Sequence, residues 1–371
     1  MFIYVFLLLF SLFVILAYRY EYLIRDLGLQ GLKWSQKSIS FFHKNKNRFY
    51  YILLVYMALI ASVRYYVGTD YWKYEEGYIN NDFWFPEVGL KVVANIFHFF
   101  NLDVQLFFLA IAISIQLLIV KSLREYSENN REILVYALFF FITFYYFNHS
   151  MNIIRQYIAI GILFLNFNNI VEKKFIKYNI YFVFMLLFHQ SSIILYPVYF
   201  IPRLFKKVIN NRSYRNIALL LSFGLMFVRF DELITSILLK FGGRFSYYAK
   251  WGAEKYLEYD LSWKMLIVLI VKLIITLWIV NNKEKFIKTK KQEVLFTIYF
   301  FGMVLTFILY PMLIFRRLLM YINIVEIVIY ALFIQKQSKH GKMILISWAL
   351  MYYFAHLLSG FSDPLPYQTV F

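Results

Sequence analysis

Long apolar runs separated by short basic segments constrain this chain more than any other feature of its sequence. Runs of about 17–25 residues match the length of a helix that crosses the hydrocarbon core of a membrane. The composition agrees, because 61% of the residues are hydrophobic and only 16% are charged, far from the balance of a soluble domain. We therefore expect an all-α, polytopic integral membrane protein in one domain, with crossings at about 2–18, 49–64, 104–120, 132–148, 152–170, 216–230, 262–280, 294–310, 317–334 and 343–359.

The basic residues form six clusters between the apolar runs, and they predict the topology. Cytoplasmic loops of membrane proteins carry such an excess of Lys and Arg, so we expect the clusters inside and both termini outside. Outer loops then lie at about 65–103 and 231–261, and the amphipathic stretch 88–100 is expected on the membrane interface. The topology explains most of the formal charge of +18, so nucleic acid is not expected as a partner. The clusters lie within 19–48, 121–131, 173–177, 203–215, 283–291 and 336–342.

Residues 178–202 are apolar but have a basic cluster on each side. A single crossing would place one of these clusters outside, whereas two short helices broken near His189 keep both inside. Irregular backbone at membrane depth requires surrounding protein or a water-filled cavity. We therefore expect a re-entrant or tightly bent pair with its polar tip toward an outer cavity, and about ten to twelve crossings in all, depending on how the pair is counted.

A small set of polar residues at the predicted outer ends of the helices could carry chemistry. Asn152, Arg155 and Gln156 have the spacing i, i+3, i+4, which predicts one helix face. An Arg at a helix end can simply reach toward lipid headgroups, but its planar fork also suits a phosphate group. His189, next to Gln190, is either a hydrogen-bonded structural residue or a general acid or base.

Further candidates lie in the outer loops and at a later helix. Asp70 follows Gly68-Thr69, so it is either an ordinary turn residue or a carboxylate at a cavity mouth that could accept a proton. Arg316 and Arg317 lie at a predicted outer helix end, against the positive-inside trend, which favours a binding role. Arg244, after two glycines, is a weaker candidate in a loop.

Two further features concern structure and metals. Lys272 and Glu326 are predicted to lie at a similar membrane depth, where we expect a structural ion pair in preference to a proton or substrate relay. The chain has no cysteine, and His189 has no partner at metal-ligand spacing, so no metal site is predicted.

Five short motifs occur along the chain in this order: Gly68-Thr69-Asp70-Tyr71, Asn152-Ile153-Ile154-Arg155-Gln156, His189-Gln190-Ser191-Ser192, Arg317 with Tyr321, and Pro366-Tyr367. This order is typical of one family, and the chain resembles the EpsG family along nearly its whole length. These proteins are Wzy-like polymerases of bacterial surface polysaccharides. The resemblance implies a glycosyltransferase architecture of the GT-C type, without a cofactor, in the bacterial cytoplasmic membrane.

The resemblance also implies the reaction and the roles of the residues. The substrates would be repeat units on undecaprenyl diphosphate and the growing polymer of an O-antigen, capsule or exopolysaccharide, joined with inversion and without a metal. His189 or Asp70 would act as the general base, with a slight preference for His189. The diphosphate would bind Arg155, Arg316, Arg317 and Arg244, and the supporting residues would be Asn152, Gln156, Gln190 and Tyr321.

Other functions remain open on the sequence alone. A lipid-linked oligosaccharide flippase would share the polytopic, basic character but should show internal repeats, and none is evident. An O-antigen ligase would carry out the same chemistry on another acceptor. A membrane O-acyltransferase would place its His and Arg elsewhere in the chain. A chain-length regulator and a flippase are candidate protein partners of a polymerase.

Overall fold

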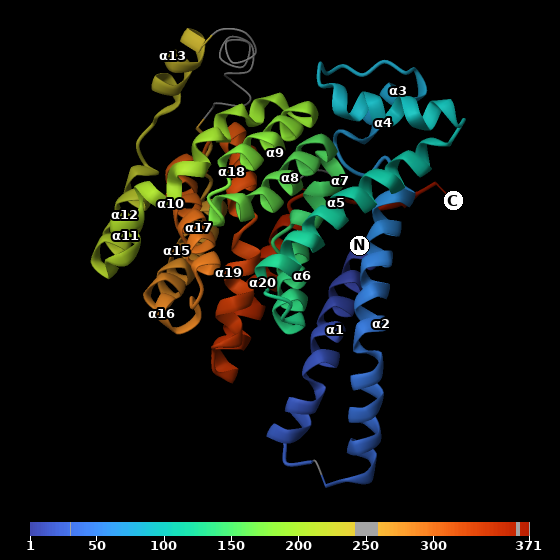
Figure 1. Cartoon of the computed structure of the whole chain (residues 1–371), viewed down its shortest axis with the longest axis vertical. Helices are drawn as coiled ribbons and strands as arrows, with labels where there is room; N and C mark the ends of the chain where they lie inside the picture. Colours follow the sequence, from blue (N-terminus) through green and yellow to red (C-terminus); the bar gives the residue numbers. More distant parts are fainter. Residues whose placement is uncertain (30, 242–258, 361–363, 371) are drawn as a thin grey trace. The chain divides into compact units, whose positions relative to one another are not determined.

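The computed structural model describes residues 1–29, 31–241, 259–360 and 364–370 (Figure 1). These residues form two compact units, which are described separately. The first unit comprises residues 1–166, 179–193 and 330–371, and the second comprises residues 167–178 and 194–329.

The first unit is built from long helices and two short ones in the loop after the second helix. The amphipathic stretch at 88–100 forms a helix as predicted, with Val92 and Ile96 on its exposed side. The helices are α1 (Phe2–Asp26), α2 (Lys33–Val63), α3 (Tyr71–Ile79), α4 (Val88–Phe99), α5 (Val104–Tyr126), α6 (Arg131–Thr143), α7 (Tyr146–Asn152) and α20 (Lys339–Leu358), together with most of α8 (Ile154–Val171) and parts of α9 (Phe175–Phe188) and α19 (Glu326–Gln335).

The two ends of the chain meet at one end of the first unit. Strand β2 (Gln368–Thr369) pairs antiparallel with β1 (Arg64–Tyr65), directly after α2. The Tyr367 hydroxyl donates to the Ile60 carbonyl at 2.6 Å, and its ring lies 5.6 Å from that of Tyr4. The start of α1, the end of α2 and the C-terminal segment therefore lie at the same level, as the predicted alternation of helices requires.

Further contacts in the same unit join the basic parts of α1 and α2 to each other and to the start of α6. Tyr18, near the end of α1, donates to Asn47 of α2 at 2.7 Å. Arg19 donates to the Tyr136 hydroxyl at 2.9 Å and pairs with Glu132 of α6 at 3.5 Å. Figure 1 shows α1 and α2 running side by side, so the basic end of α1 and the basic start of α2 lie away from the chain ends.

Two predicted helices are broken. The expected helix at 132–148 is divided into α6 and α7, which are bent by 57°, and Tyr145 between them has a φ of +69°. A left-handed residue cannot continue a right-handed helix. The expected helix at 317–334 begins earlier and is divided into α18 (Leu313–Asn323) and α19, bent by 53°.

The described part of the second unit contains two long helices, α15 and α17, and several shorter segments. Asn211 accepts from the backbone N–H groups of Ser213 and Tyr214 and so caps the start of α12, while Thr289 and Gln292 form a capping box at α17. The elements are the 3₁₀ helix η1 (Gln190–Phe200), α10 (Ile201–Leu204), α11 (Lys206–Asn210), α12 (Arg212–Leu225), α13 (Asp231–Phe241), α15 (Trp263–Asn281), α16 (Lys283–Phe286), α17 (Lys290–Leu309) and α18.

The segment at 178–202 doubles back, as predicted. Helix α9 ends at Phe188, and η1 begins two residues later. The ring of Phe175 lies 5.0 Å from that of Tyr199, and the Tyr178 hydroxyl donates to the Tyr196 carbonyl at 3.2 Å. A straight helix would separate residues 175 and 199 by about 36 Å. The turn is therefore at His189, and its depth in the membrane stays a prediction.

The all-helical, polytopic class is confirmed, but the predicted number of crossings is not. Among the described residues, five helices are long and apolar enough to cross a membrane, or seven if each bent pair is one span. The sequence-based count of ten to twelve also included α2, α8, α9 and α12. Helices α9 and α12 have only 14 residues each, α2 starts in a basic segment, and α8 carries Arg155 and several asparagines.

Candidate functional site

Two motifs that lie far apart in the sequence meet in the first unit. The Asn152 side chain accepts a hydrogen bond from the Asp70 backbone N–H at 2.9 Å and donates to the Thr69 hydroxyl at 3.0 Å. Gly68 has a φ of +99°, and a Cβ at this position would lie 3.0 Å from the Asn152 side-chain oxygen. Asn152 therefore holds the turn that places half-buried Asp70 at the start of α3.

Arg155 forms a buried ion pair with Glu87. Its Nη1 lies 2.7 Å from Glu87 Oε2, and the two residues are only 8% and 2% exposed. The guanidinium also lies over two rings of the same loop, 3.9 Å from the Phe85 centroid and 5.4 Å from the Trp84 centroid. Sequence reasoning missed Glu87 as a site residue, because a carboxylate just before a helix start is usually an ordinary helix-terminal charge.

Glu87 also binds the turn that contains His189. Its Oε1 accepts from the Gln190 backbone N–H at 3.2 Å. Packing is close here, since a Cβ on Gly89 would lie 2.9 Å from the Leu187 carbonyl oxygen. One buried carboxylate thus joins the outer loop, the start of α8 and the turn after α9.

The Arg155 guanidinium keeps unused hydrogen-bonding capacity. A guanidinium has five N–H donors, and Nε of Arg155 is buried with no hydrogen-bond partner among the described residues. Tyr74 of α3 is buried nearby, and burial raises the pKa of its phenol, so the phenol stays neutral at physiological pH. The described residues therefore leave one buried N–H donor of Arg155 unused beside the ion pair.

The expected common helix face of Asn152, Arg155 and Gln156 is wrong. Helix α7 ends at Asn152, and α8 begins at Ile154, because Ile153 between them has φ −101° and ψ 59°, outside the helical region. Asn152 therefore reaches the Thr69-Asp70 turn while Arg155 reaches Glu87. Gln156 follows in α8 and is buried.

A second buried arginine was also missed by sequence reasoning. Arg64 is 1% exposed and follows α2 directly. It donates to the Met151 carbonyl at 2.8 Å and to the Ala61 carbonyl, and its guanidinium lies 4.9 Å from the Phe108 ring centroid. These contacts join α2 to the end of α7, so they place Asn152 relative to the Gly68-Thr69-Asp70 turn. In the sequence, Arg64 stands at the end of an apolar run, and nothing distinguishes it there from an ordinary arginine at the membrane interface.

The remaining candidates belong to the second unit or lie outside the described residues. Arg316 donates to the carbonyls of Tyr310 at 2.7 Å and of Asp260 at 3.2 Å, so its guanidinium holds the turn between α17 and α18. Arg317 is partly exposed on α18, and Tyr321 is buried one turn later. Arg244 lies outside the described residues. The gathering of Arg316 and Arg317 with Arg155 and His189 stays a prediction.

The predicted pair of Lys272 and Glu326 is confirmed. Lys272 Nζ lies 3.0 Å from Glu326 Oε2, and both residues are buried. A buried ion pair adds little net stability. Removing one partner is nevertheless strongly destabilising, because it leaves an uncompensated buried charge. Within the described part of the chain, no group of three or more His, Asp or Glu residues is arranged to hold a metal ion.

Comparison with known proteins identifies the family. The family model described as the EpsG family matches residues 47–369. The match covers most of the chain, so the chain belongs to the EpsG family, as the order of the short motifs suggested. No curated protein and no solved structure matches the chain. Membership relates this membrane protein to polysaccharide biosynthesis.

Proposed function

We propose that this member of the EpsG family polymerises oligosaccharide repeat units that are linked to undecaprenyl diphosphate. The reaction is an inverting, metal-independent glycosyl transfer at the outer face of the bacterial cytoplasmic membrane. One observation carries the site: the buried Glu87 carboxylate binds both Arg155 and the His189-Gln190 turn. In the same unit, Asn152 positions Asp70.

The transfer needs stabilisation of a leaving diphosphate. The acceptor hydroxyl oxygen forms a bond to the anomeric carbon, and the bond from that carbon to the diphosphate oxygen breaks with its electron pair. Negative charge then grows on the lipid diphosphate, where oriented N–H donors in a low-dielectric site are most effective. Arg155 supplies such donors from the N–H groups that Glu87 leaves unused.

The acceptor hydroxyl must also lose its proton to a general base. His189 and Asp70 are the two candidates in the first unit, and we favour His189. An imidazole has an ordinary pKa near 6.5, so it can take a proton at neutral pH. The bond from Gln190 to Glu87 fixes the backbone next to His189. The backbone N–H of Asp70 is held by Asn152, and the Asp70 carboxylate would instead orient a sugar hydroxyl.

The second unit contributes a separate anion-binding candidate. Arg317 is partly exposed, whereas the donors of Arg316 are directed at backbone carbonyls. We therefore assign diphosphate contact to Arg317 in preference to Arg316. An Arg316→Lys variant should consequently disturb the α17–α18 turn more than the affinity for the diphosphate.

The surface glycan of a deletion strain tests the proposal. A single capped repeat unit on the surface indicates a lost polymerase, no outer glycan indicates a flippase, and lipid-linked polymer without transfer indicates a ligase. Complementation with the wild-type chain should restore long glycan, and it should do so in membranes treated with a metal chelator. Loss of all outer glycan in the deletion strain would contradict the polymerase assignment.

A further inference from the structure

A cavity of about 260 Å³ lies within the second unit, and none of the candidate site residues discussed above lines it. Its apolar part is formed by Ile170, Val171, Ile209 and Val294. Its volume is somewhat below the range of about 300–1,000 Å³ that is usual for drug-sized ligands. It therefore suits a compact headgroup more than an oligosaccharide.

Four cationic side chains line this cavity: Lys173, Arg203, Lys206 and Lys290. Among the residues that the structure describes, none of the four forms an ion pair. The guanidinium of Arg203 lies 5.6 Å from the Tyr199 ring centroid, a contact that directs a cation without neutralising it. The cavity is therefore strongly electropositive.

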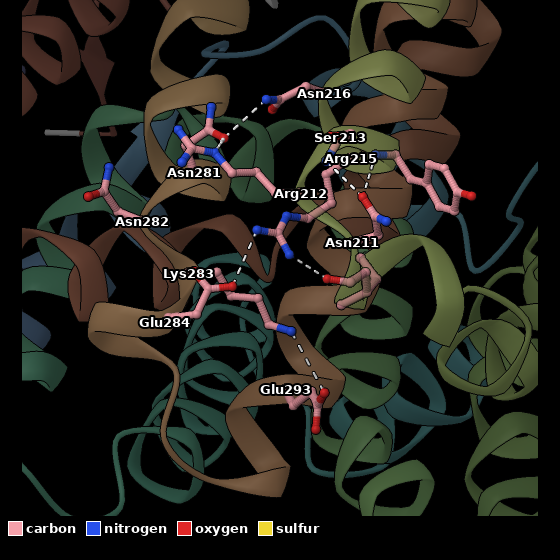
Figure 2. Close-up of polar contacts among 12 residues, drawn as sticks. Asn211, Arg212, Ser213, Arg215, Asn216, Asn281, Asn282, Lys283, Glu284 and Glu293 are labelled. Carbon is pink, nitrogen blue, oxygen red and sulfur yellow. Dashed lines mark hydrogen bonds and ion pairs between the residues drawn. The ribbon is translucent and has the colours of Figure 1, made fainter.

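The single acidic residue of the lining does not offset this charge, because it is already engaged. Glu293 lies 3.7 Å from Lys283, which is itself buried. Figure 2 shows this pair beside the neighbouring pair of Arg215 and Glu284, whose atoms lie 3.3 Å apart. Arg215 also donates to the carbonyl of Ile209, a lining residue. This polar network fixes one wall of the cavity.

Lys290 lies at a position where a cation lowers the stability of its own helix, α17. It is the first residue of α17, where the positive end of the helix dipole disfavours a cation. The other basic lining residues belong to basic clusters that the positive-inside rule places at the cytoplasmic side. Topology explains why these residues are basic, but not why four cations from three separate segments surround one cavity with an apolar floor.

We propose that this cavity binds the phosphate group of an anionic phospholipid of the cytoplasmic leaflet. The four cations would contact the phosphate oxygens, and the apolar floor would accept the first part of an acyl chain. Basic pockets between helices on this side of a membrane have the chemistry to recognise such headgroups. The site is independent of the glycosyl-transfer site proposed above.

A pair of charge-matched double variants of the full-length protein in neutral detergent tests this site. Arg203→Gln with Lys206→Gln removes two lining cations. Lys177→Gln with Lys207→Gln removes two exposed cations from the same region that do not line the cavity. Binding of phosphatidylglycerol, phosphatidylcholine and inorganic phosphate is measured by native mass spectrometry or titration.

The wild type and the control should bind phosphatidylglycerol in preference to phosphatidylcholine, and the cavity variant should bind it roughly tenfold or more weakly. If the cavity variant is unstable, Val294→Phe fills the space while keeping all four cations and should cause the same loss. Binding of inorganic phosphate alone, with the same dependence on Arg203 and Lys206, would support the phosphate site but assign it to a soluble ligand. Equal loss in both double variants, or none in either, would overturn the proposal.

Discussion

Arg155 has a structural contact that does not depend on substrate, because its guanidinium is already paired with the Glu87 carboxylate. A buried charge pair is a weak source of net stability, yet breaking it leaves one uncompensated charge and costs about 3–5 kcal/mol. Arg155 could therefore matter for folding alone. A set of variants can separate the structural from the chemical contribution, since the two respond differently when both charges are removed.

Arg155→Lys keeps the charge but loses the planar fork, so polymerisation should fall by about 10²-fold or more while the chain still inserts. Glu87→Gln should lower the free energy of unfolding by about 3–5 kcal/mol. The double variant Arg155→Gln with Glu87→Gln should regain stability without regaining polymerisation. Thermal unfolding in detergent and glycan length in a complemented deletion strain are the measurements. Long glycan from the double variant would remove Arg155 from the mechanism.

His189→Ala should leave single repeat units on the surface at normal protein level, because the favoured base is missing. Its neighbour Gln190 binds Glu87 through the backbone, so the His189→Ala variant keeps that contact. Glycan length is again the measurement. Long glycan from His189→Ala would transfer the role of base to Asp70.

Gly68 should be more sensitive to substitution than Gly28, although both have positive φ values of +99° and +69°. An added Cβ meets Asn152 at 3.0 Å only in the case of Gly68, whereas Gly28 has open space. Gly68→Ala should therefore reduce polymerisation, because it displaces Asn152 and with it Asp70. Gly28→Ala costs only backbone strain of about 1–3 kcal/mol. Equal polymerisation by the two variants would show that the position of the turn does not matter.

Breaks in helices position the candidate groups. The left-handed Tyr145 separates α6 from α7, and Ile153 separates α7 from α8. A continuous helix would have directed Asn152 and Arg155 to the same side. Because the chain is interrupted, Asn152 reaches the Gly68-Thr69-Asp70 turn, and Arg155 reaches a different part of the same outer loop.

The doubled-back segment can be tested by cross-linking, since the native chain has no cysteine. Phe175→Cys with Tyr199→Cys should cross-link readily through a short bifunctional reagent, because their rings are 5.0 Å apart. The control variant, Phe175→Cys with Phe188→Cys, has both cysteines on one helix about 20 Å apart. It should not cross-link. Cross-linking is read as a mobility shift after cleavage between the two positions. Absence of the first cross-link would mean that the segment crosses the membrane once.

Contacts within each unit bring together segments that lie next to basic clusters. In the first unit, contacts join Tyr18 to Asn47 and Arg19 to Glu132. In the second unit, Arg212 donates to Asn281 at 2.7 Å, so the start of α12 meets the end of α15 (Figure 2). Within each unit, helix segments that lie next to different basic clusters are therefore in contact with one another.

Single cysteines test the orientation in the membrane. Lys44→Cys and Lys288→Cys should resist a membrane-impermeant thiol reagent in intact cells, because both residues belong to predicted cytoplasmic clusters. Asp82→Cys, in the outer loop before α4, should react. All three positions are exposed, so a difference reports the side of the membrane and not burial. Labelling of Lys288→Cys from outside would reverse the topology of the second unit.

The sequence by itself determined the helical membrane class, the breaks near His189, the Lys272–Glu326 pair and the family, because apolar length, charge placement and motif order are local properties of the chain. It overestimated the number of helices long enough to cross a membrane, because composition alone does not show that α9 and α12 have only 14 residues each. Only the tertiary structure decided that Glu87 pairs with Arg155 and that Asn152 holds Asp70. Those contacts join residues 68 and 82 positions apart in the chain, and no spacing rule links side chains across such distances.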